Sequence, residues 1–183
     1  DAAFSTNWDL SSQLGYIVFA ADGQGKCCLL HWNSYKSSRV TRSVLGSEVY
    51  AFCDAMDIAL AFRAALAPVL SKKIPVRMFT DSKSLFDTIT KRSQTTEKRL
   101  LIDLATVREA YMTREIEDVA WVRSEFNLAD CMTKQVRSPV LNQTLLEATL
   151  SHPIEQWIVR SNRNPTPHDM SQGKLGDMSK TKH

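Results

Sequence analysis

PVRMFTDSKSLF, residues 75–86, is the stretch from which the rest of the chain is best interpreted. A short, mostly apolar run ends at Thr80, one carboxylate follows at Asp81, and a serine-rich turn then opens an amphipathic segment. This pattern predicts a buried strand that leads into a helix, with Asp81 at the carboxyl end of the strand. Ligands of open α/β sheets bind just outside the carboxyl ends of strands, so Asp81 is a candidate catalytic acid. On this segment alone, a helix-capping role for Asp81 is an equally good interpretation.

The composition is that of an ordinary globular protein. The chain has 183 residues, 43% hydrophobic and 23% charged, which is enough for one sizeable core. Its formal net charge of +3 is compatible with a nucleic-acid partner but too small to argue for one. No apolar run is long enough to span a bilayer, so we expect a soluble protein with no membrane partner. Four cysteines without a CxxC pair argue against a thiolate zinc site and favour reduced intracellular thiols: Cys27, Cys28, Cys53 and Cys131.

Three strands are predicted before the Asp81 stretch. Residues 1–4 have the pattern of the end of a strand whose first half lies upstream, so we expect a truncated first strand. Residues 14–21 (LGYIVFAA) predict a buried strand, residues 22–26 a glycine-containing hairpin turn, and residues 27–32 (CCLLHW) the returning strand. Together they predict an antiparallel beginning to the sheet.

The loop expected at residues 33–42 mixes cations with aromatic side chains. Such a mixture can stack on bases and pair with phosphates. A solvated connection without a ligand explains the same residues equally well. The candidate phosphate contacts, in this loop and just after Asp81, are Lys36, Arg39, Arg42 and Lys83.

Residues 43–66 carry the longest helical pattern. Apolar side chains recur at helical spacing from Leu45, and Ser43 can cap the start. Glu48 lies at the edge of the apolar face, where a carboxylate is costly unless it is paired or holds a metal ion. General burial statistics favour a surface glutamate as the alternative.

The rest of the chain predicts further helices and one further strand. We expect helices over residues 82–91 and 98–114, a polar break over 93–97, a strand over 118–122, and a helix from Ser138-Pro139 to about residue 150. Asn127 can cap another short helix that has Asp130 in its first turn.

This order of elements predicts an α/β fold, a mixed five-stranded sheet flanked by helices. We divide the chain into a sheet-containing domain over residues 1–136 and a helical extension over 137–160, with a last short element around Trp157. The polar segment over 161–183 is expected to be a disordered tail.

Four acids stand at junctions between these elements: Asp1, Glu48, Asp81 and Asp130. In the predicted sheet they can converge, and converging carboxylates repel one another unless cations lie between them. Hard oxygen ligands suit Mg²⁺ or Mn²⁺. Two such ions about 4 Å apart can activate water and stabilise a leaving oxygen, which is the chemistry of phosphodiester hydrolysis.

Four motifs that contain these acids, and a fifth that does not, follow one another along most of the chain. These are DAAF at 1–4, SEVYAF at 47–52, FTDSKSL at 79–85, EKRLLIDLATVREAY at 97–111 and WVRSEFNLADCMTK at 121–134. From residue 1 to about 135 the sequence resembles the ribonuclease H domain of Ty/copia-type retrotransposon polyproteins, and the fungal branch is the most similar. In that family the carboxylates of D-A-x-F, S-E-x-Y-A, D-S-x-S-L and N-x-A-D form the catalytic metal-binding set, which corresponds to Asp1, Glu48, Asp81 and Asp130.

The resemblance implies a ribonuclease H-like fold and an endonuclease that cuts the RNA strand of RNA–DNA hybrids after reverse transcription. Asp1 and Asp81 would bridge two Mg²⁺ or Mn²⁺ ions, Glu48 would hold the ion at the leaving group, and Asp130 the ion that activates water. Partners would be the hybrid, recognised through 2′-hydroxyls and minor-groove shape, and the reverse transcriptase domain of the same polyprotein. The expected location is intracellular, in the cytoplasm, a virus-like particle or the nucleus.

The sequence departs from this family pattern in its last loop, residues 123–127 (RSEFN), and at its start. Cellular ribonucleases H often carry a histidine in that loop. Glu125 is a conceivable replacement, although a solvated glutamate is the simpler interpretation, and no catalytic role is expected for His31, His152 or His168. No reverse transcriptase segment precedes residue 1, so the natural polypeptide is expected to be longer, or the chain to come from a truncated copy.

Two other functions remain open at this point. One is a catalytically inactive ribonuclease H-like module that binds nucleic acid or protein. The other is an integrase-like or junction-resolving nuclease, which the spacing of the S-E-x-Y-A and N-x-A-D motifs disfavours.

Overall fold

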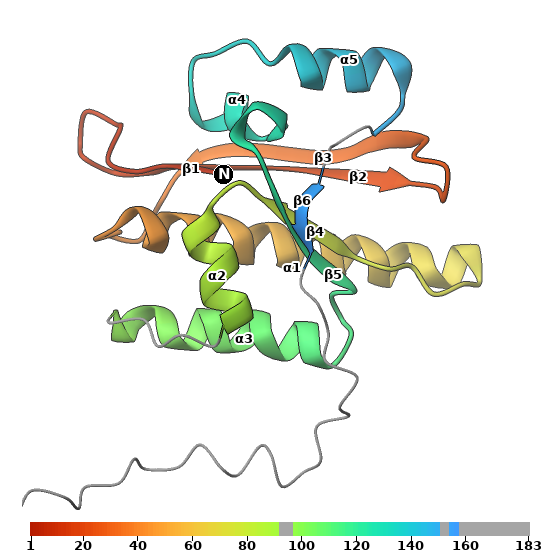
Figure 1. Cartoon of the computed structure of the whole chain (residues 1–183), viewed down its shortest axis with the longest axis horizontal. Helices are drawn as coiled ribbons and strands as arrows, with labels where there is room; N and C mark the ends of the chain where they lie inside the picture. The colour runs from red at the N-terminus through yellow and green to blue at the C-terminus, as the bar shows by residue number, and fades with distance from the viewer. Residues whose placement is uncertain (92–96, 151–153, 158–183) are drawn as a thin grey trace, which may run out of the picture.

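The computed structural model describes residues 1–91, 97–150 and 154–157, and the predicted tail at 161–183 lies outside this part of the chain. It has a mixed α/β architecture (Figure 1). The strands are β1 (Ala2–Ala3), β2 (Gln13–Ala21), β3 (Cys27–Lys36), β4 (Arg77–Thr80), β5 (Asp118–Val122) and β6 (Ile154–Trp157). The α-helices are α1 (Val44–Leu70), α2 (Lys83–Lys91), α3 (Leu101–Met112), α4 (Asp130–Thr133) and α5 (Pro139–Glu147). Two short 3₁₀ turns are η1 (Lys98–Leu100) and η2 (Ser124–Phe126).

The first three strands form an antiparallel sheet in the order β1-β2-β3, as predicted. The hairpin turn also agrees with the prediction, since the Asp22 carboxylate accepts hydrogen bonds from the backbone N–H groups of Gln24 and Lys26, each at 2.9 Å. Strand β3 continues to Lys36, beyond the predicted end at residue 32, because Gln13 of β2 pairs with Lys36. Lys36 therefore lies on a strand and not on the predicted loop.

The other three strands form a second sheet in the order β4-β5-β6. β4 and β5 are parallel, with Thr80 opposite Trp121, and β6 pairs antiparallel with β5. The segment over 137–160 thus contains a strand as well as helix α5, so it is not purely helical.

The single five-stranded sheet expected from the sequence is divided in two. In the described residues, no ladder of backbone hydrogen bonds joins β1 to β4. The physical reason is the length of β1, whose two residues pair with Leu14 and Gln13 of β2 and leave little backbone for a second neighbour.

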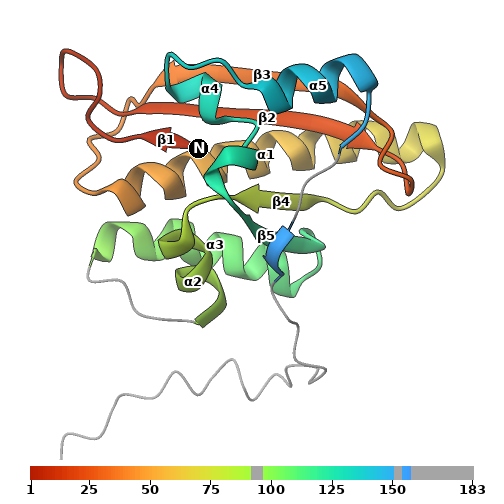
Figure 2. The same cartoon turned by 45° about the horizontal axis from the view of Figure 1, so that its top comes forward.

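The helices cover both faces of the first sheet and one side of the second. In Figure 1 α1 lies below the first sheet, α4 and α5 lie above it, and α2 and α3 lie below β4 and β5; in Figure 2, with the top turned forward, α4 and α5 lie in front of the first sheet. Gly15 lets α4 approach β2, because a Cβ atom there would come within 2.5 Å of Met132 Cβ. This close approach holds the first residue of α4, Asp130, near the start of the chain.

Helix α1 begins as the sequence predicts. Ser43 is its N-cap, and its Oγ accepts a hydrogen bond from Gly46 N at 3.0 Å. The helix runs four residues past the predicted end, through Pro68, and closes at Ser71 in the left-handed region with φ 49°. None of the described helices has the length and apolar character needed to cross a membrane.

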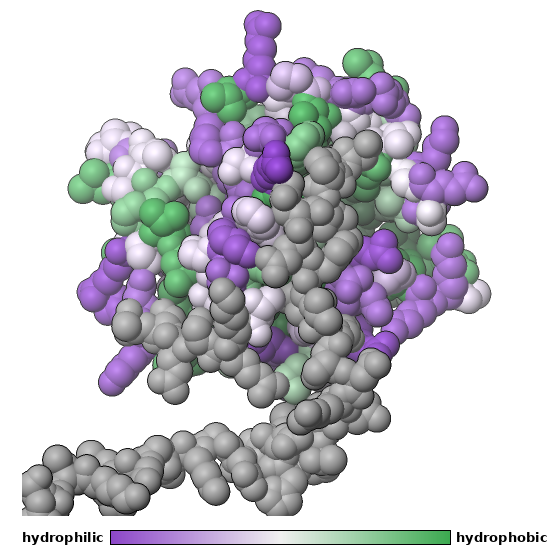
Figure 3. Space-filling view, in the orientation of Figure 1, coloured by the Kyte–Doolittle hydropathy of each residue, from purple (hydrophilic) through white to green (hydrophobic). Residues whose placement is uncertain are grey.

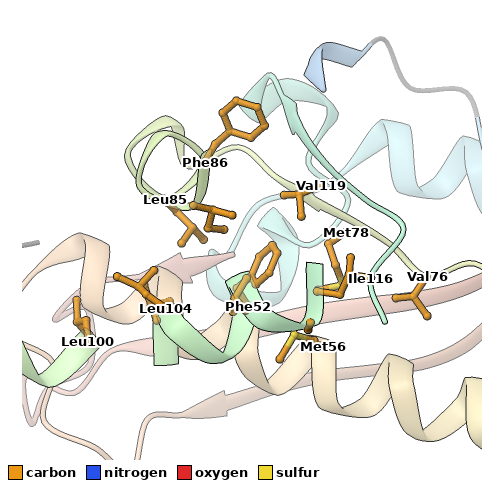
Figure 4. Packing of buried hydrophobic residues seen from close by; sticks show 14 residues of the cluster. Phe52, Met56, Val76, Met78, Leu85, Phe86, Leu100, Leu104, Ile116 and Val119 are labelled. Carbon is orange, nitrogen blue, oxygen red and sulfur yellow. The ribbon is translucent and has the colours of Figure 1, made fainter. Parts of the chain in front are cut away.

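The main core lies between α1, α2, α3 and the β4–β5 pair (Figure 4). Phe86 and Ile116 are fully buried there, and Phe52 and Met56 of α1 reach into the same cluster. Burying side chains of this kind contributes on the order of 1.5–3 kcal/mol each. The core therefore fixes the end of β4, and with it Asp81, against α1.

Candidate metal centre

Three of the four predicted acids come together. Asp1, Asp81 and Asp130 each place a carboxylate oxygen so that the three atoms lie within 4.8 Å of one another. Asp1 immediately precedes β1, Asp81 follows β4, and Asp130 opens α4. The predicted position of Asp81 at the carboxyl end of a strand is therefore confirmed.

Asn127 links two of these carboxylates. Its side-chain Nδ2 donates hydrogen bonds to Asp1 Oδ1 at 3.0 Å and to Asp81 Oδ1 at 2.9 Å. Its Oδ1 accepts a hydrogen bond from the backbone N–H of Ala129 at 3.0 Å, which holds the amide in this orientation. The residue directly before α4 is Ala129, so Asn127 is not its immediate N-cap, but the Asn127 side chain makes a capping hydrogen bond to the turn that leads into the helix.

Two further polar side chains contact the acids from α4 and just beyond it. Thr133 Oγ1 donates a hydrogen bond to Asp1 Oδ2, and Lys134 Nζ forms an ion pair with Asp130 Oδ1. Sequence analysis missed both. Lys134 follows Asp130 by four residues, the spacing at which helical side chains meet, so the i,i+4 rule was the available signal.

Glu48 is the fourth acid, and it is buried in α1 with only 7% of its surface exposed. The alternative of a surface glutamate is therefore wrong. Glu48 lies outside the group of three acids whose oxygens meet. Burial raises its pKa to about 7; the Asp1 amino group and a hydrogen bond from the Ala2 backbone oppose this rise, and the negative charge of Asp81 adds to it.

Neighbouring groups also fix the backbone at Asp81. Trp121 Nε1 donates a hydrogen bond to the Asp81 carbonyl oxygen at 3.1 Å. Thr80 Oγ1 accepts one from Ser82 N at 3.1 Å. Since Trp121 and Thr80 are opposite each other in the parallel ladder, the sheet register itself sets the position of this carboxylate.

The four predicted phosphate contacts lie in different surroundings. Lys83 follows Asp81 by two residues, and its Nζ lies 3.3 Å from Asp87 Oδ1 and 4.7 Å from the centre of the Trp121 ring. Lys36 pairs with Asp9 at 3.1 Å.

The remaining two cations belong to the segment before α1. Arg39 lies 3.6 Å from Asp103 and stacks over Tyr50 at 5.0 Å, and Arg42 is exposed. Of the four, Lys83 is nearest in the chain to a site acid, whereas the ion pairs of Lys36 and Arg39 are with Asp9 and Asp103, which do not belong to the site.

Glu125 is the conceivable replacement for a catalytic histidine, and His31, His152 and His168 are the histidines for which no catalytic role is expected. Glu125 is exposed and lies 3.8 Å from Arg123. His31 lies between the rings of Tyr16 and Phe62, at 5.7 and 6.2 Å, on the side of the first sheet that faces α1. His152 and His168 lie outside the described residues.

A groove of about 1210 Å³ adjoins the acids. Ala2 and Ala3 line it beside Asp1, and residues 131–137 form another wall. Lys134 and Arg137 are its charged lining residues, and none of the described side chains that line it is acidic. The groove therefore carries the charge opposite to that of the carboxylates it adjoins.

The donor set fits a hard divalent cation. Asp1, Asp81 and Asp130 offer carboxylate oxygens only, which suit Mg²⁺ or Mn²⁺ and not a soft metal. The groups that contact these oxygens in the structure are donors or cations, as expected for carboxylates that need positive charge. The chain matches no protein-family model, no curated protein and no solved structure, so the site is interpreted from its own residues.

Proposed function

We propose that this chain is a divalent-metal-dependent ribonuclease H domain that hydrolyses the RNA strand of RNA–DNA hybrids. The observation that carries the proposal is the convergence of Asp1, Asp81 and Asp130 from three distant segments. Burial of Glu48 in the helix beside them supports it, because an ionised carboxylate is costly to bury unless it is paired or holds a cation. The motif order described above supplies the ribonuclease H interpretation of this arrangement.

The proposal includes a ribonuclease H-like fold. Its support is the side-by-side position of the start of β1 and the end of β4, whose acids Asp1 and Asp81 share the Asn127 amide. With β4 next to β1, strands β1 to β5 would form the expected five-stranded mixed sheet, and β6 would be a sixth strand beyond β5.

The acids would hold two Mg²⁺ ions, with Mn²⁺ as a substitute. When bound, these ions supply an activated water and a stabilised leaving oxygen for phosphodiester hydrolysis. Asp1, Asp81 and Asp130 provide the ligand oxygens, and Glu48 adds a fourth carboxylate from α1. Asn127 and Thr133 orient Asp1, and Lys134 neutralises Asp130 until a cation replaces it.

Substrate and setting follow from the same proposal. The basic groove beside the acids suits a phosphate backbone, and the partners would be an RNA–DNA hybrid and the reverse transcriptase domain of a Ty/copia-type polyprotein. The location would be the cytoplasm, a virus-like particle or the nucleus.

A binding module without catalysis is the second candidate. The observation that favours it is the occupation of the acids by the chain's own donors, since Asn127, Thr133 and Lys134 already contact all three carboxylates. Carboxylates that are already hydrogen-bonded or ion-paired within the protein do not require a metal ion.

A substrate panel tests the proposal. The protein is incubated with Mg²⁺ and with strand-labelled RNA–DNA hybrid, duplex RNA, duplex DNA and branched DNA. Cleavage confined to the RNA strand of the hybrid is the expected result. Cleavage of branched or duplex DNA would identify another nuclease class, and binding without cleavage of any substrate would identify the inactive module.

A further inference from the structure

We propose that a stripe of side chains on the first sheet, Trp8, Lys36, Ser34 and Trp32, binds single-stranded nucleic acid that extends from the substrate held at the acids. This inference rests on the proposed function, because it extends the path of the same substrate. The four side chains of the stripe are separate from the acids that would hold a metal ion.

The stripe lies on the face of β3 that points away from α1. His31 contacts Phe62 of α1, and Tyr35 donates a hydrogen bond to Asp54 of α1, so the residues that alternate with them face the other way. Trp32, Ser34 and Lys36 therefore share the outer face, roughly 7 Å from one to the next. All three are exposed, and Trp32 is 58% exposed although it is one of the largest apolar side chains.

The loop between β1 and β2 adds Trp8 to one end of this stripe. Trp8 is 90% exposed, and Lys36 Nζ lies 5.2 Å from the centre of its ring while also pairing with Asp9 at 3.1 Å. The loop projects from the body at the left of both ribbon views (Figures 1 and 2). In the space-filling view the same region is mostly white and green, less hydrophilic than the surface around α5 (Figure 3).

Hydrogen bonds within this loop fix its conformation. Asn7 Nδ2 donates to Ser11 O at 3.1 Å, and Leu10 N donates to Asn7 O at 2.9 Å. Ser11 Oγ donates to Asp9 Oδ1 at 2.6 Å. A large aromatic ring presented to water on a hydrogen-bonded loop is a ready stacking surface.

A chain of polar contacts joins the stripe to the groove beside the acids. Asn7 Nδ2 donates to Gln13 Oε1 at 3.4 Å, Gln13 Nε2 donates to Ser34 Oγ at 2.9 Å, and Ser34 Oγ donates to the carbonyl oxygen of Met132. All four residues line the groove. The groove, which starts next to Asp1, thus meets the stripe at Ser34, and the stripe has a tryptophan at each end.

The chemistry of this surface selects a nucleic-acid strand. Lys134 and Arg137 line the groove, and on the stripe Lys36 offsets the charge of Asp9, with which it pairs. Exposed aromatic rings spaced along a cationic groove are how proteins bind single strands without reading sequence, because every base has a face that can stack. A duplex offers its bases only at its ends, so a single-stranded extension is the occupant that can use both tryptophans.

The test measures binding in the absence of metal ions, so that it does not depend on cleavage. Short labelled oligouridine and oligothymidine are titrated with the full chain in EDTA, and fluorescence anisotropy is recorded. The variants are Trp8→Ala, Trp32→Ala and Trp8→Phe. Ile102→Ala is the matched control, because Ile102 is 78% exposed on α3, away from the stripe.

We expect each tryptophan-to-alanine change to weaken binding roughly five- to a hundredfold, and Trp8→Phe to retain most of the affinity. Tighter binding of oligouridine would assign the path to the RNA strand, and tighter binding of oligothymidine to the DNA strand. The inference is overturned if the unaltered protein binds neither oligonucleotide, or if both alanine variants stay within about twofold of Ile102→Ala.

A second arm separates this inference from the proposed function. Cleavage is compared on a blunt hybrid and on a hybrid with a single-stranded extension. Trp8→Ala should raise KM for the extended substrate alone. If no hybrid is cut at all, the proposed function fails while the EDTA titration still decides whether the stripe binds a strand.

Discussion

The Asn127 side-chain amide lies 2.9 Å from Asp81 and donates a hydrogen bond to its Oδ1. The same nitrogen donates to Asp1, so one neutral group occupies the space between two carboxylates. This arrangement orients both acids before any cation arrives. It also means that the metal-free site depends on Asn127 to offset the repulsion between the two charges.

Asn127→Ala should therefore destabilise the metal-free protein more than the metal-bound one. Hydrogen bonds to charged groups contribute about 1.5–3 kcal/mol each, so a loss of that order is expected without metal. Saturating Mg²⁺ should then raise the Tm of the variant by more than it raises the Tm of the unaltered protein, because cations replace the lost donors. Thermal unfolding with and without Mg²⁺ measures both effects. Asn142→Ala, at an exposed position on α5, is the control, and an equal Mg²⁺ response in Asn127→Ala and the unaltered protein would contradict the account.

Glu48→Gln should stabilise the metal-free protein at and above pH 7 and weaken Mg²⁺ binding. The pKa of Glu48 is raised from 4.5 to about 7, mainly by burial, so the folded state favours its protonated form. The stability that this carboxyl contributes is complete below pH 4.5 and is lost as pH rises through about 7, a change on the order of 3 kcal/mol.

Chemical unfolding of metal-free protein across pH 4–8 measures this dependence. The amide that Glu48→Gln introduces has no proton to lose, so the variant should keep its stability over that window. Glu109→Gln, at an exposed site on α3, should leave the pH profile of the unaltered protein unchanged. If the free energy of unfolding falls equally with rising pH in the unaltered protein and in Glu48→Gln, another group is responsible for the pH dependence.

Lys134→Ala should tighten Mg²⁺ binding. Lys134 forms an ion pair with Asp130, and an incoming cation has to displace its ammonium group. Because both side chains are partly exposed, the gain should be modest, about two- to fivefold in Kd. Isothermal titration calorimetry measures it, with Lys72→Ala, at an exposed position beyond the end of α1, as the control. Weaker Mg²⁺ binding by the variant would contradict a competing role for Lys134.

Gly15→Ala should disturb the site from a distance. A Cβ atom at position 15 would lie 2.5 Å from Met132 Cβ, so α4 would have to move away from β2 and would take Asp130 with it. Overpacking of this kind costs about 1–3 kcal/mol. Gly23→Ala is the matched control, since nothing lies within 4 Å of its Cβ position. Denaturant unfolding measures the stability of each variant, and Mg²⁺ affinity reports on the acid site. If Gly15→Ala and Gly23→Ala have the same stability and the same Mg²⁺ affinity, the close approach of α4 to β2 is refuted.

Local patterns were sufficient to predict much of this fold. The β2 hairpin turn, the Ser43 cap of α1 and the strand that ends at Asp81 all follow from short-range chemistry: glycine at a turn, a hydroxyl before a helix, and an apolar run closed by a carboxylate. These features need no knowledge of distant residues. Sequence reasoning is strongest where the deciding contacts lie within a few residues.

The features that the sequence did not predict depend on contacts between residues far apart in the chain. Thr133 reaches Asp1 and Asn127 reaches Asp81 from distant parts of the chain, so nothing in their neighbourhood shows what they touch. Local chemistry favours a capping role for Asn127, and its Oδ1 does accept the Ala129 N–H, but nothing local shows that its Nδ2 donates to two distant carboxylates. β3 continues past residue 32 because its partner β2 supplies backbone groups as far as Gln13. The expected single sheet is divided because β1 is too short to pair on both sides.

The central claim is that the acids form a metal-dependent catalytic site, and one measurement tests it most directly. Mg²⁺-dependent cleavage of an RNA–DNA hybrid labelled on the RNA strand is compared for the unaltered chain and for Asp81→Asn, with circular dichroism to verify that both are folded. The account predicts RNA cleavage by the unaltered chain that requires Mg²⁺ and falls by at least about a hundredfold in Asp81→Asn. Equal cleavage by two folded proteins, or none by the unaltered chain, would contradict it.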